Sequence, residues 1–170
     1  MNELGEGDSL QDMVGPLGVA SNFEGVKKVA VIGGGLGTAI AYPQAKKLHS
    51  MGVSVDMING FRNKDLIIIE DLCKAGCTNL CTMTDDRSNG NQGFVTAKLE
   101  ELINSGEKYD LVVAIGPLVM MKAVCDLTRK YDIKTIVSMN PIMIDGTGMC
   151  GGCRITVGGE TKFACVDGPD

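Results

Sequence analysis

The chain alternates between short apolar runs and longer stretches in which apolar residues recur at helical spacing. Continuous apolar runs are typical of strands that are buried on both faces of a parallel sheet. These runs cover residues 26–32, 54–59, 78–82, 110–115 and 134–138. Helical spacing is found over residues 39–48, 65–73, 94–104 and 119–130, and Asp65 is placed to cap the second of these helices. Because strands alternate with helices, the pattern predicts an α/β fold with a five-stranded parallel sheet and helices on both faces.

The two ends of the chain do not follow this alternation. Residues 4–18 carry several glycines around a short apolar core and predict an irregular strand and turn, with a flexible N-terminal arm as the alternative. After Asn140-Pro141 the chain continues as a cysteine-rich loop, followed by two short alternating segments, 153–157 and 160–163. These segments flank Gly158-Gly159, and a two-glycine turn in that position predicts a β-hairpin.

Composition limits the function classes. The length of 170 residues indicates one domain, with room for a small appendage. The net charge of −5 and the lack of a basic stripe with aromatic residues argue against a nucleic-acid partner. The longest apolar run, residues 111–121, is too short to cross a bilayer, and the N-terminus does not resemble a signal peptide. We therefore expect a cytoplasmic protein without a membrane partner, in which seven cysteines favour metal or redox use over disulfides.

The most specific chemistry is near the C-terminus, in the series Asp145, Cys150, Cys153 and Cys165. Four residues separate the first two, two separate the next two, and eleven separate the last two. Plant-type [2Fe–2S] sites use C-x4-C-x2-C…C spacing, which this chain shows with Asp in the first position. Thiolates are soft ligands that suit iron, and the glycines between them let the backbone wrap closely around a cluster. Structural zinc and three metal-free buried thiols are the alternatives.

A glycine-rich turn follows the first predicted strand and precedes the first predicted helix. Its sequence is Gly33-Gly34-Gly35-Leu36-Gly37-Thr38. In a dinucleotide-binding turn, such glycines let the backbone approach the pyrophosphate, which the helix N-terminus attracts. The match to G-x-G-x-x-G is incomplete because Thr38 occupies the third glycine position. A tight strand-to-helix turn without a ligand is the alternative.

Other candidate contacts follow the later strands. Arg62 is placed to meet a 2′-phosphate, to stack on adenine, or to lie in solvent. No acidic residue precedes it, so the choice between NAD and NADP stays open. Gly116-Pro117 ends the fourth strand and can bring backbone to a nicotinamide, or simply form a turn. Asp85 and Asp86 head a polar loop on the same edge of the sheet and are candidates for ribose contacts or for plain solvated loop residues.

The other four cysteines have less specific positions. Cys73 and Cys77 are four residues apart and Cys81 lies in the next strand, so a metal site or thiol switch is conceivable. Free cysteine packs as a small hydrophobe, which favours buried apolar roles for all three. Cys125 lies between apolar residues of a predicted helix and is assigned to the core.

Several of these motifs occur together in one known family. The chain resembles the ferredoxin–NADP reductase superfamily, and within it the small iron–sulfur flavoprotein subunit of NADH-dependent ferredoxin:NADP oxidoreductase and sulfide dehydrogenase. That branch is related to the electron-transfer subunit of dihydroorotate dehydrogenase. The motifs that carry the resemblance are Gly33–Pro43, Thr84-Asp85-Asp86, Gly93-Phe94-Val95, Ile115-Gly116-Pro117, Met120–Ala123, Asp145–Arg154 and Phe163–Pro169.

The resemblance implies three parts, which would be a remnant of an FAD-binding barrel and linker (1–25), an NAD(P)-binding domain (26–140) and a [2Fe–2S] module (141–170). It implies Asp145, Cys150, Cys153 and Cys165 as cluster ligands, and a larger flavoprotein or iron–sulfur subunit and ferredoxin as partners. It also implies electron transfer between NAD(H) or NADP(H), FAD and the cluster. Because hydride transfer needs no side-chain acid or base, no catalytic residue is expected.

The sequence also departs from the family pattern. Ile40 stands where relatives generally have Pro, and Thr38 stands where they have an apolar residue. The FAD barrel is missing, so the chain is expected to be a part of a longer subunit and inactive in flavin reduction by itself. The alternative function is a nucleotide-binding α/β module with a structural zinc site and no redox role.

Overall fold

The computed structural model describes residues 4–91, 93–139 and 142–170. These residues form two compact units, which are described separately. Of the described residues, one unit comprises those within 21–139, together with the final residue, and the other comprises 4–20 together with 142–169. The division into three parts at residues 25 and 140 stays a prediction, and its second boundary lies outside the described residues.

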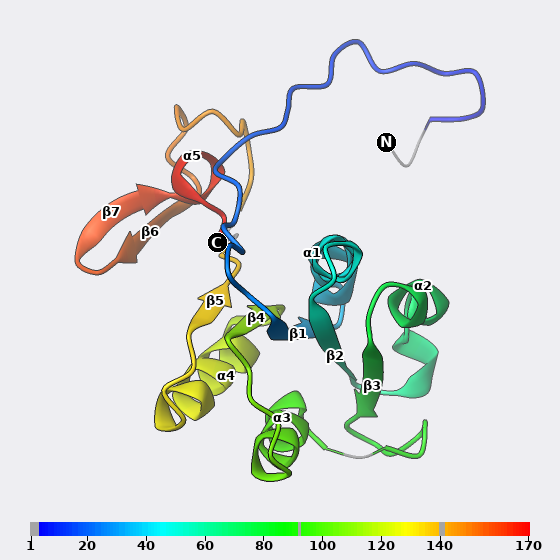
Figure 1. Cartoon of the computed structure of the whole chain (residues 1–170). Coiled ribbons are helices and arrows are strands. Elements are labelled where there is room, and N and C mark those ends of the chain that lie inside the picture. Colours follow the sequence, from blue (N-terminus) through cyan, green and yellow to red (C-terminus); the bar gives the residue numbers. More distant parts are fainter. Residues whose placement is uncertain (1–3, 92, 140–141) are drawn as a thin grey trace. The chain divides into compact units, whose positions relative to one another are not determined.

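The larger unit contains the parallel sheet and its helices (Figure 1). In chain order its elements are β1 (Lys28–Gly34), α1 (Gly37–Ser50), β2 (Ser54–Phe61), a 3-10 turn η1 (Lys64–Leu66), α2 (Glu70–Ala75), β3 (Asn79–Thr84), α3 (Val95–Asn104), β4 (Leu111–Ile115), α4 (Leu118–Lys130) and β5 (Thr135–Val137). The five strands are all parallel, in the order β3-β2-β1-β4-β5. The predicted five-stranded parallel sheet is therefore confirmed.

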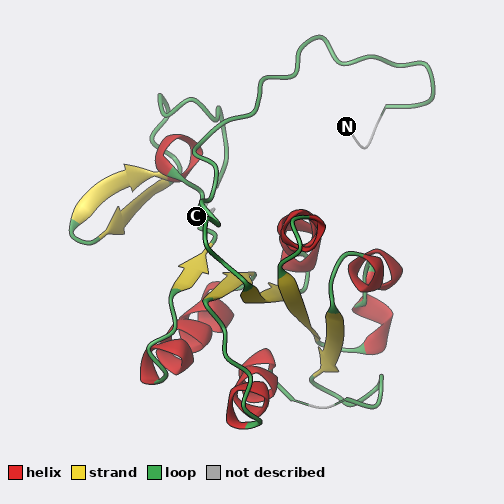
Figure 2. Ribbon diagram, viewed as in Figure 1, coloured by secondary structure: helices red, strands yellow, loops and turns green. Residues whose placement is uncertain are grey.

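Helices cover both faces of this sheet (Figure 2). Side chains alternate along β1, so that Val29 and Val31 pack with α1 and α2 in one core, while Ala30 and Ile32 pack with α3 and α4 in the other. Burial on both faces explains why the strands read as continuous apolar runs. The chain moves from β1 outward to β3 and then returns to β4 on the opposite side of β1. The reversal places a crevice at the carboxyl ends of β1 and β4, where open α/β sheets bind ligands.

The helix predicted over residues 65–73 is wrong in its extent. The structure has η1 at Lys64–Leu66, and α2 begins only at Glu70. Ile69 adopts a left-handed conformation, with φ of 47°, which separates the two elements and costs a β-branched residue some strain. Asp65 is not a cap, because its amide donates to the side chain of Asn63, which caps η1.

A buried polar network lies at the amino end of the sheet. Asp56 is only 4% exposed on β2, and its carboxylate accepts hydrogen bonds from the Tyr109 hydroxyl and the Asn79 side-chain amide, both at 2.7 Å. The Lys28 ammonium lies 3.4 Å from the same carboxylate and also pairs with Glu107. Because each buried polar group has partners, this network stabilises the sheet at the end opposite the crevice.

The smaller unit consists of the chain ends. It contains the antiparallel hairpin β6 (Arg154–Val157) and β7 (Glu160–Phe163), as the sequence predicts, and a short helix α5 (Ala164–Asp167) that the sequence does not indicate. The strand expected within residues 4–18 is wrong, because this segment is an extended arm with turns (Figure 1). Among the described helices, none has the length and apolar content needed to cross a bilayer.

Candidate functional site

The glycine turn between β1 and α1 is closely packed against its neighbours. A Cβ atom at Gly37 would lie 2.3 Å from the carbonyl oxygen of Ile115, and one at Gly33 would lie 2.7 Å from the Cα of Thr38. Because backbone atoms cannot move aside cheaply, these two positions require glycine. Gly35 differs, since its φ is +54° and a Cβ there would meet nothing within 4 Å. The turn therefore packs on one side and presents open backbone on the other.

Thr38 serves the packed side of this turn. Its side chain is fully buried and faces Gly33, whose other neighbour is Asn59 of β2. Thr38 Oγ1 and Asn59 Oδ1 find no hydrogen-bond partner among the described residues. Thr38 thus lies beneath the turn and outside the pocket lining, although the glycine-turn motif predicts it as a cofactor contact.

The N-terminus of α1 opens toward the crevice. No side chain caps it, and its first turn contains no acidic residue. The first backbone N–H groups of a helix carry partial positive charge, and without a cap they are available to an anion. A phosphate or pyrophosphate is the group that such a glycine turn and helix end accept.

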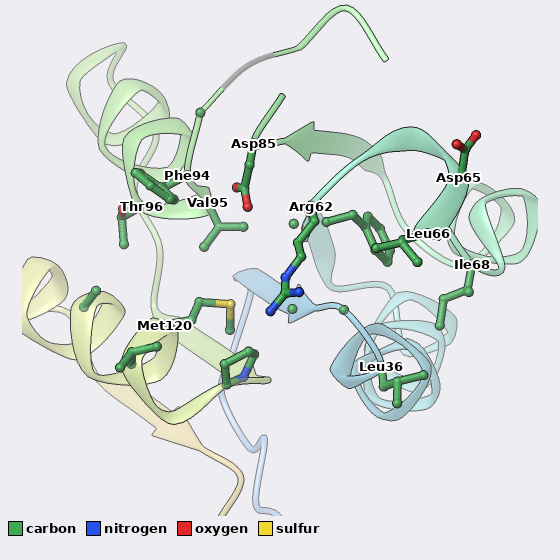
Figure 3. Close-up of a pocket in the computed structure, with 18 residues that line it drawn as sticks. Leu36, Arg62, Asp65, Leu66, Ile68, Asp85, Phe94, Val95, Thr96 and Met120 are labelled. Atoms are coloured by element: carbon green, nitrogen blue, oxygen red, sulfur yellow. The ribbon is translucent and has the colours of Figure 1, made fainter. Parts of the chain in front are cut away.

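A pocket of about 780 Å³ lies at the carboxyl ends of β1, β2 and β4 (Figure 3). This volume is within the usual range for small-molecule and cofactor sites. Of the predicted contacts, the pocket brings together Gly34, Gly35, Leu36, Arg62, Asp85 and Pro117. Gly33, Gly37, Thr38, Asp86 and Gly116 are outside its lining.

Much of the pocket wall is apolar and was not predicted. One side is formed by residues 93–96, at the start of α3, and another by Val119, Met120 and Ala123 of α4. Leu66, the last residue of η1, and Ile68, which follows η1, complete the apolar wall. The sequence signal for these walls is the family resemblance of the motifs Gly93-Phe94-Val95 and Met120–Ala123. An apolar wall beside an open helix end suits a ligand that joins a flat ring to an anion.

Charge in the pocket is sparse. Arg62 is the cationic member of the lining, and its guanidinium extends into the pocket on the side of Met120 (Figure 3). Asp85 enters from the end of β3 on another side. The neighbouring Asp86 instead serves its own loop, because its carboxyl accepts hydrogen bonds from Ser88, which hold the pKa of Asp86 below its usual value.

The smaller unit brings the cysteine-rich donors near one another. The sulfur atoms of Cys153 and Cys165 are 3.3 Å apart, because Cys153 leads into β6 and Cys165 follows β7 across the hairpin. The Asp145 carboxylate accepts a hydrogen bond from the amide of Cys150 at 2.8 Å. Cys150 itself is exposed, and its sulfur accepts from the Gly152 amide.

Hydrogen bonds in this group favour thiolate formation at Cys153. Its sulfur accepts from the Cys165 amide and shares a thiol hydrogen bond with the Cys165 sulfur, which lowers the pKa of Cys153. The shared bond with Cys153, together with burial, raises the pKa of Cys165. Hydrogen bonds from Thr147 and from the amide of Cys150 lower the pKa of Asp145 to about 2, so its carboxylate is ionised at neutral pH.

These donors fit an iron–sulfur cluster by chemical type, since they are thiols and an ionised carboxylate with backbone N–H groups directed at sulfur. The geometry is less complete. Across residues 4–91, 93–139 and 142–170, no three His, Cys, Asp or Glu side chains meet closely enough to hold a metal ion. The structure pairs Cys153 with Cys165 and Asp145 with the backbone of Cys150. The full four-ligand set stays a prediction.

Taken together, the fold and the two groups of residues define a class: an α/β domain of the ferredoxin reductase type, followed by a cysteine-rich segment. Residues 140–170 match the family model described as the iron-sulfur cluster binding domain of dihydroorotate dehydrogenase B. The chain is a relative of dihydroorotate dehydrogenase B electron transfer subunits and of NADH-dependent ferredoxin–NADP oxidoreductase. The family resemblance seen in the sequence is therefore confirmed.

The relatives match nearly the whole chain. The chain is 45% identical to a dihydroorotate dehydrogenase B electron transfer subunit homologue from Thermotoga maritima and 51% identical to an uncharacterised protein from Clostridium beijerinckii. Each alignment covers 97% of this chain and 58% of the relative. The chain thus spans about three fifths of the length of these curated relatives.

A solved structure has the same fold over nearly the whole chain. One chain in the structure of the NADH-dependent reduced ferredoxin–NADP oxidoreductase matches with a TM-score of 0.87 and 42% identity, over 98% of this chain and 59% of that one. The C-terminal domain of a hydrogenase from Pyrococcus furiosus shares the fold, with a TM-score of 0.58 over 72% of this chain.

Proposed function

We propose that this chain is the nucleotide-binding and iron–sulfur part of an electron-transfer subunit of an NAD(P)H-dependent oxidoreductase. The observation that carries the proposal is the paired sulfur atoms of Cys153 and Cys165, with Asp145 and Cys150 in the same unit, within the segment that matches an iron–sulfur family. The names of the relatives and the pocket at the glycine turn support the same function.

In this proposal the pocket binds a nicotinamide dinucleotide. The open side of Gly35 and the uncapped N-terminus of α1 would receive the pyrophosphate. Arg62 would contribute a positive charge near the phosphates or the adenosine, and Asp85 an acceptor for a ribose hydroxyl. The apolar wall at Pro117 and Met120 would exclude water from one face of the nicotinamide. The residues leave both NAD(H) and NADP(H) as candidates.

Asp145, Cys150, Cys153 and Cys165 are the proposed ligands of a [2Fe–2S] cluster. When bound, such a cluster accepts and releases single electrons. The chain contributes three thiol sulfurs and one hard carboxylate, and the amides of Gly152 and Cys165 donate to sulfur, which tunes the reduction potential of a cluster. Asp145 Oδ1 accepts from Thr147 and Oδ2 accepts from the Cys150 amide, which leaves Oδ2 a second lone pair with which it could bind iron.

The remaining parts of the pathway are proposals about the whole protein. Relatives are longer than this chain, and we propose that FAD binds on the additional part and exchanges hydride with the nicotinamide. A larger flavoprotein or iron–sulfur subunit would then take electrons from the cluster, with ferredoxin as a further partner. A cytoplasmic location also stays a prediction.

Metal analysis of the full chain, purified without oxygen, tests the central claim. We expect about two iron and two sulfide per chain, with visible absorption that bleaches on reduction by dithionite. The Cys165→Ser variant should lose most of this iron, whereas Cys81→Ser, which removes a half-buried thiol of β3, should keep it. A colourless protein with about one zinc per chain would instead support the structural-zinc alternative.

A further inference from the structure

The N-terminal segment Leu17–Val19, which we name the strap, contacts the iron–sulfur segment near the first and near the last proposed ligand. The Val19 amide donates to the carbonyl oxygen of Gly168 at 2.9 Å. A Cβ on Gly146 would lie 2.7 Å from the Leu17 side chain, so Leu17 covers the loop that follows Asp145. These contacts join the strap to residues just after the first and last proposed ligands.

Gly18 shows how closely the strap is seated. Its φ is +76°, a conformation that L side chains rarely adopt. A Cβ at Gly18 would lie 2.1 Å from the Gly168 carbonyl oxygen and 3.6 Å from the Cys165 carbonyl oxygen. Since both neighbours are backbone atoms, a side chain at this position can be accommodated only if the strap separates from the residues around Cys165.

The rest of the N-terminal segment behaves differently. A Cβ at Gly7 or at Gly15 would meet nothing within 4 Å, and Met13 and Val14 are 79% and 73% exposed. Figure 1 shows this part of the chain as an extended arm. Close contact with the iron–sulfur segment is therefore confined to the strap, which makes it a local feature and not a general property of the N-terminus.

We propose that Leu17, Gly18 and Val19 are positioning residues for the cluster, which hold the ligand loop and the segment after Cys165 together and so slow the loss of iron. This inference rests on the proposed iron–sulfur function. The argument is geometric: Asp145 and Cys165 are the outer members of the ligand set, and the strap bonds or packs beside each of them. Release of the strap would allow these outer ligands to separate.

The test compares iron release from four full-length proteins purified without oxygen: wild type, Gly18→Ala, Leu17→Ala and Gly7→Ala. A strong ferrous chelator is added, and the decay of the visible absorption is followed. For Gly18→Ala we expect release about tenfold faster, equivalent to about 1.4 kcal/mol. For Leu17→Ala, which keeps the backbone bond, we expect release about threefold faster. The effect is smaller because the Leu17 side chain is only half-buried, so its truncation removes a limited apolar contact.

Gly7→Ala is the matched control, because it has the same backbone strain at φ of +96° but no neighbour within 4 Å. Its release rate should stay within about twofold of wild type. Equal release rates for Gly18→Ala and wild type would overturn the proposal. Circular dichroism of each variant confirms that the sheet unit, which does not include the strap, is folded.

Hydrogen exchange of the metal-free chain separates this proposal from the cluster assignment. The Val19 amide should be protected in wild type and in Gly7→Ala, and should exchange at least about tenfold faster in Gly18→Ala. A Val19 amide without protection in wild type would overturn the strap, even if iron binds. If the strap is protected but no chain takes up iron and sulfide, the proposed function fails and the positioning role for a cluster fails with it.

Discussion

The hydroxyl of Tyr109 offers a test of how the sheet is stabilised. This side chain is 7% exposed, and its hydroxyl donates to the Asp56 carboxylate at 2.7 Å. Tyr109→Phe removes one hydrogen bond to a charged acceptor without changing the shape of the ring. Hydrogen bonds to charged groups contribute about 1.5–3 kcal/mol, so we expect the free energy of unfolding to fall by about that amount. Asp56 keeps Asn79 and Lys28 as partners, which limits the loss.

Tyr131→Phe is the matched control for this substitution. The Tyr131 hydroxyl bonds to Glu100 and Asn104 at 3.2 and 3.3 Å on the partly exposed surface of α3. Surface substitutions usually change stability by less than about 0.5 kcal/mol. Urea unfolding followed by circular dichroism measures both variants against wild type. Equal losses for the two substitutions would refute the argument, because they would show that burial of the Asp56 partner has no effect.

The pH dependence gives the same prediction a second check. Burial and the bond to Asp56 raise the pKa of Tyr109 above its usual value of about 10. A raised pKa contributes stability that is present below the unfolded pKa and is lost as pH rises above it. The difference between wild type and Tyr109→Phe should therefore be constant from about pH 6 to 9 and shrink above about pH 10. A difference that grows above pH 10 would contradict this assignment.

Three further predictions concern single positions. Gly37→Ala should lower the free energy of unfolding by about 1–3 kcal/mol, because its Cβ meets backbone at 2.3 Å. The loss should exceed that of Gly35→Ala, which faces open space and bears only the cost of its positive φ; urea unfolding measures both. Arg62→Ala should weaken NADH or NADPH binding about tenfold or more in calorimetric titration, whereas Arg87→Ala, outside the pocket lining, should leave it unchanged. Asp110 accepts from the amides of residues 27 and 28, which lowers its pKa, so its stabilising effect is present above about pH 4 and is lost as pH falls. In urea unfolding, the free energy of unfolding of Asp110→Asn should therefore fall less steeply than that of wild type between about pH 5 and 2.

Much of the sheet unit was predictable because its strands are buried on both faces. Such strands read as continuous apolar runs, and the helices between them show their own spacing. The helix over residues 65–73 was predicted wrongly for a physical reason. Ile69 packs against the core beside α2, and it does so from a left-handed conformation that apolar spacing does not indicate. The helix α2 therefore begins only after this residue, at Glu70, with Glu70 and Asp71 in its first turn.

Of the two walls of the pocket, the sequence predicts only the one formed by the glycine turn. Three clustered glycines after a strand indicate a turn near a ligand, and Gly34 and Gly35 do line the pocket. Thr38 is predicted as a contact in the same turn, and its place beneath Gly33 depends on how α1 packs on the sheet, which the turn motif does not indicate. The opposite wall, at Phe94 and Met120, depends on where α3 and α4 begin in space, and this information is not local in the sequence.

The cysteines divide into two groups by environment, and this division supports confining the metal chemistry to the smaller unit. Burial raises the pKa of four thiols of the sheet unit, at Cys73, Cys77, Cys81 and Cys125, with Cys77 at about 11. Burial favours the neutral form of these four thiols, whereas the thiolate is the form that binds metal. In the smaller unit the pKa of Cys153 is lowered because its sulfur accepts from the Cys165 amide, and the pKa of Cys165 is raised because the Cys153 sulfur lies beside it, so these two thiols act as a pair. The iron content of this chain should therefore be unchanged by substitution of any of the four sheet-unit cysteines. Loss of iron in one of these variants would contradict the assignment of the metal to the smaller unit.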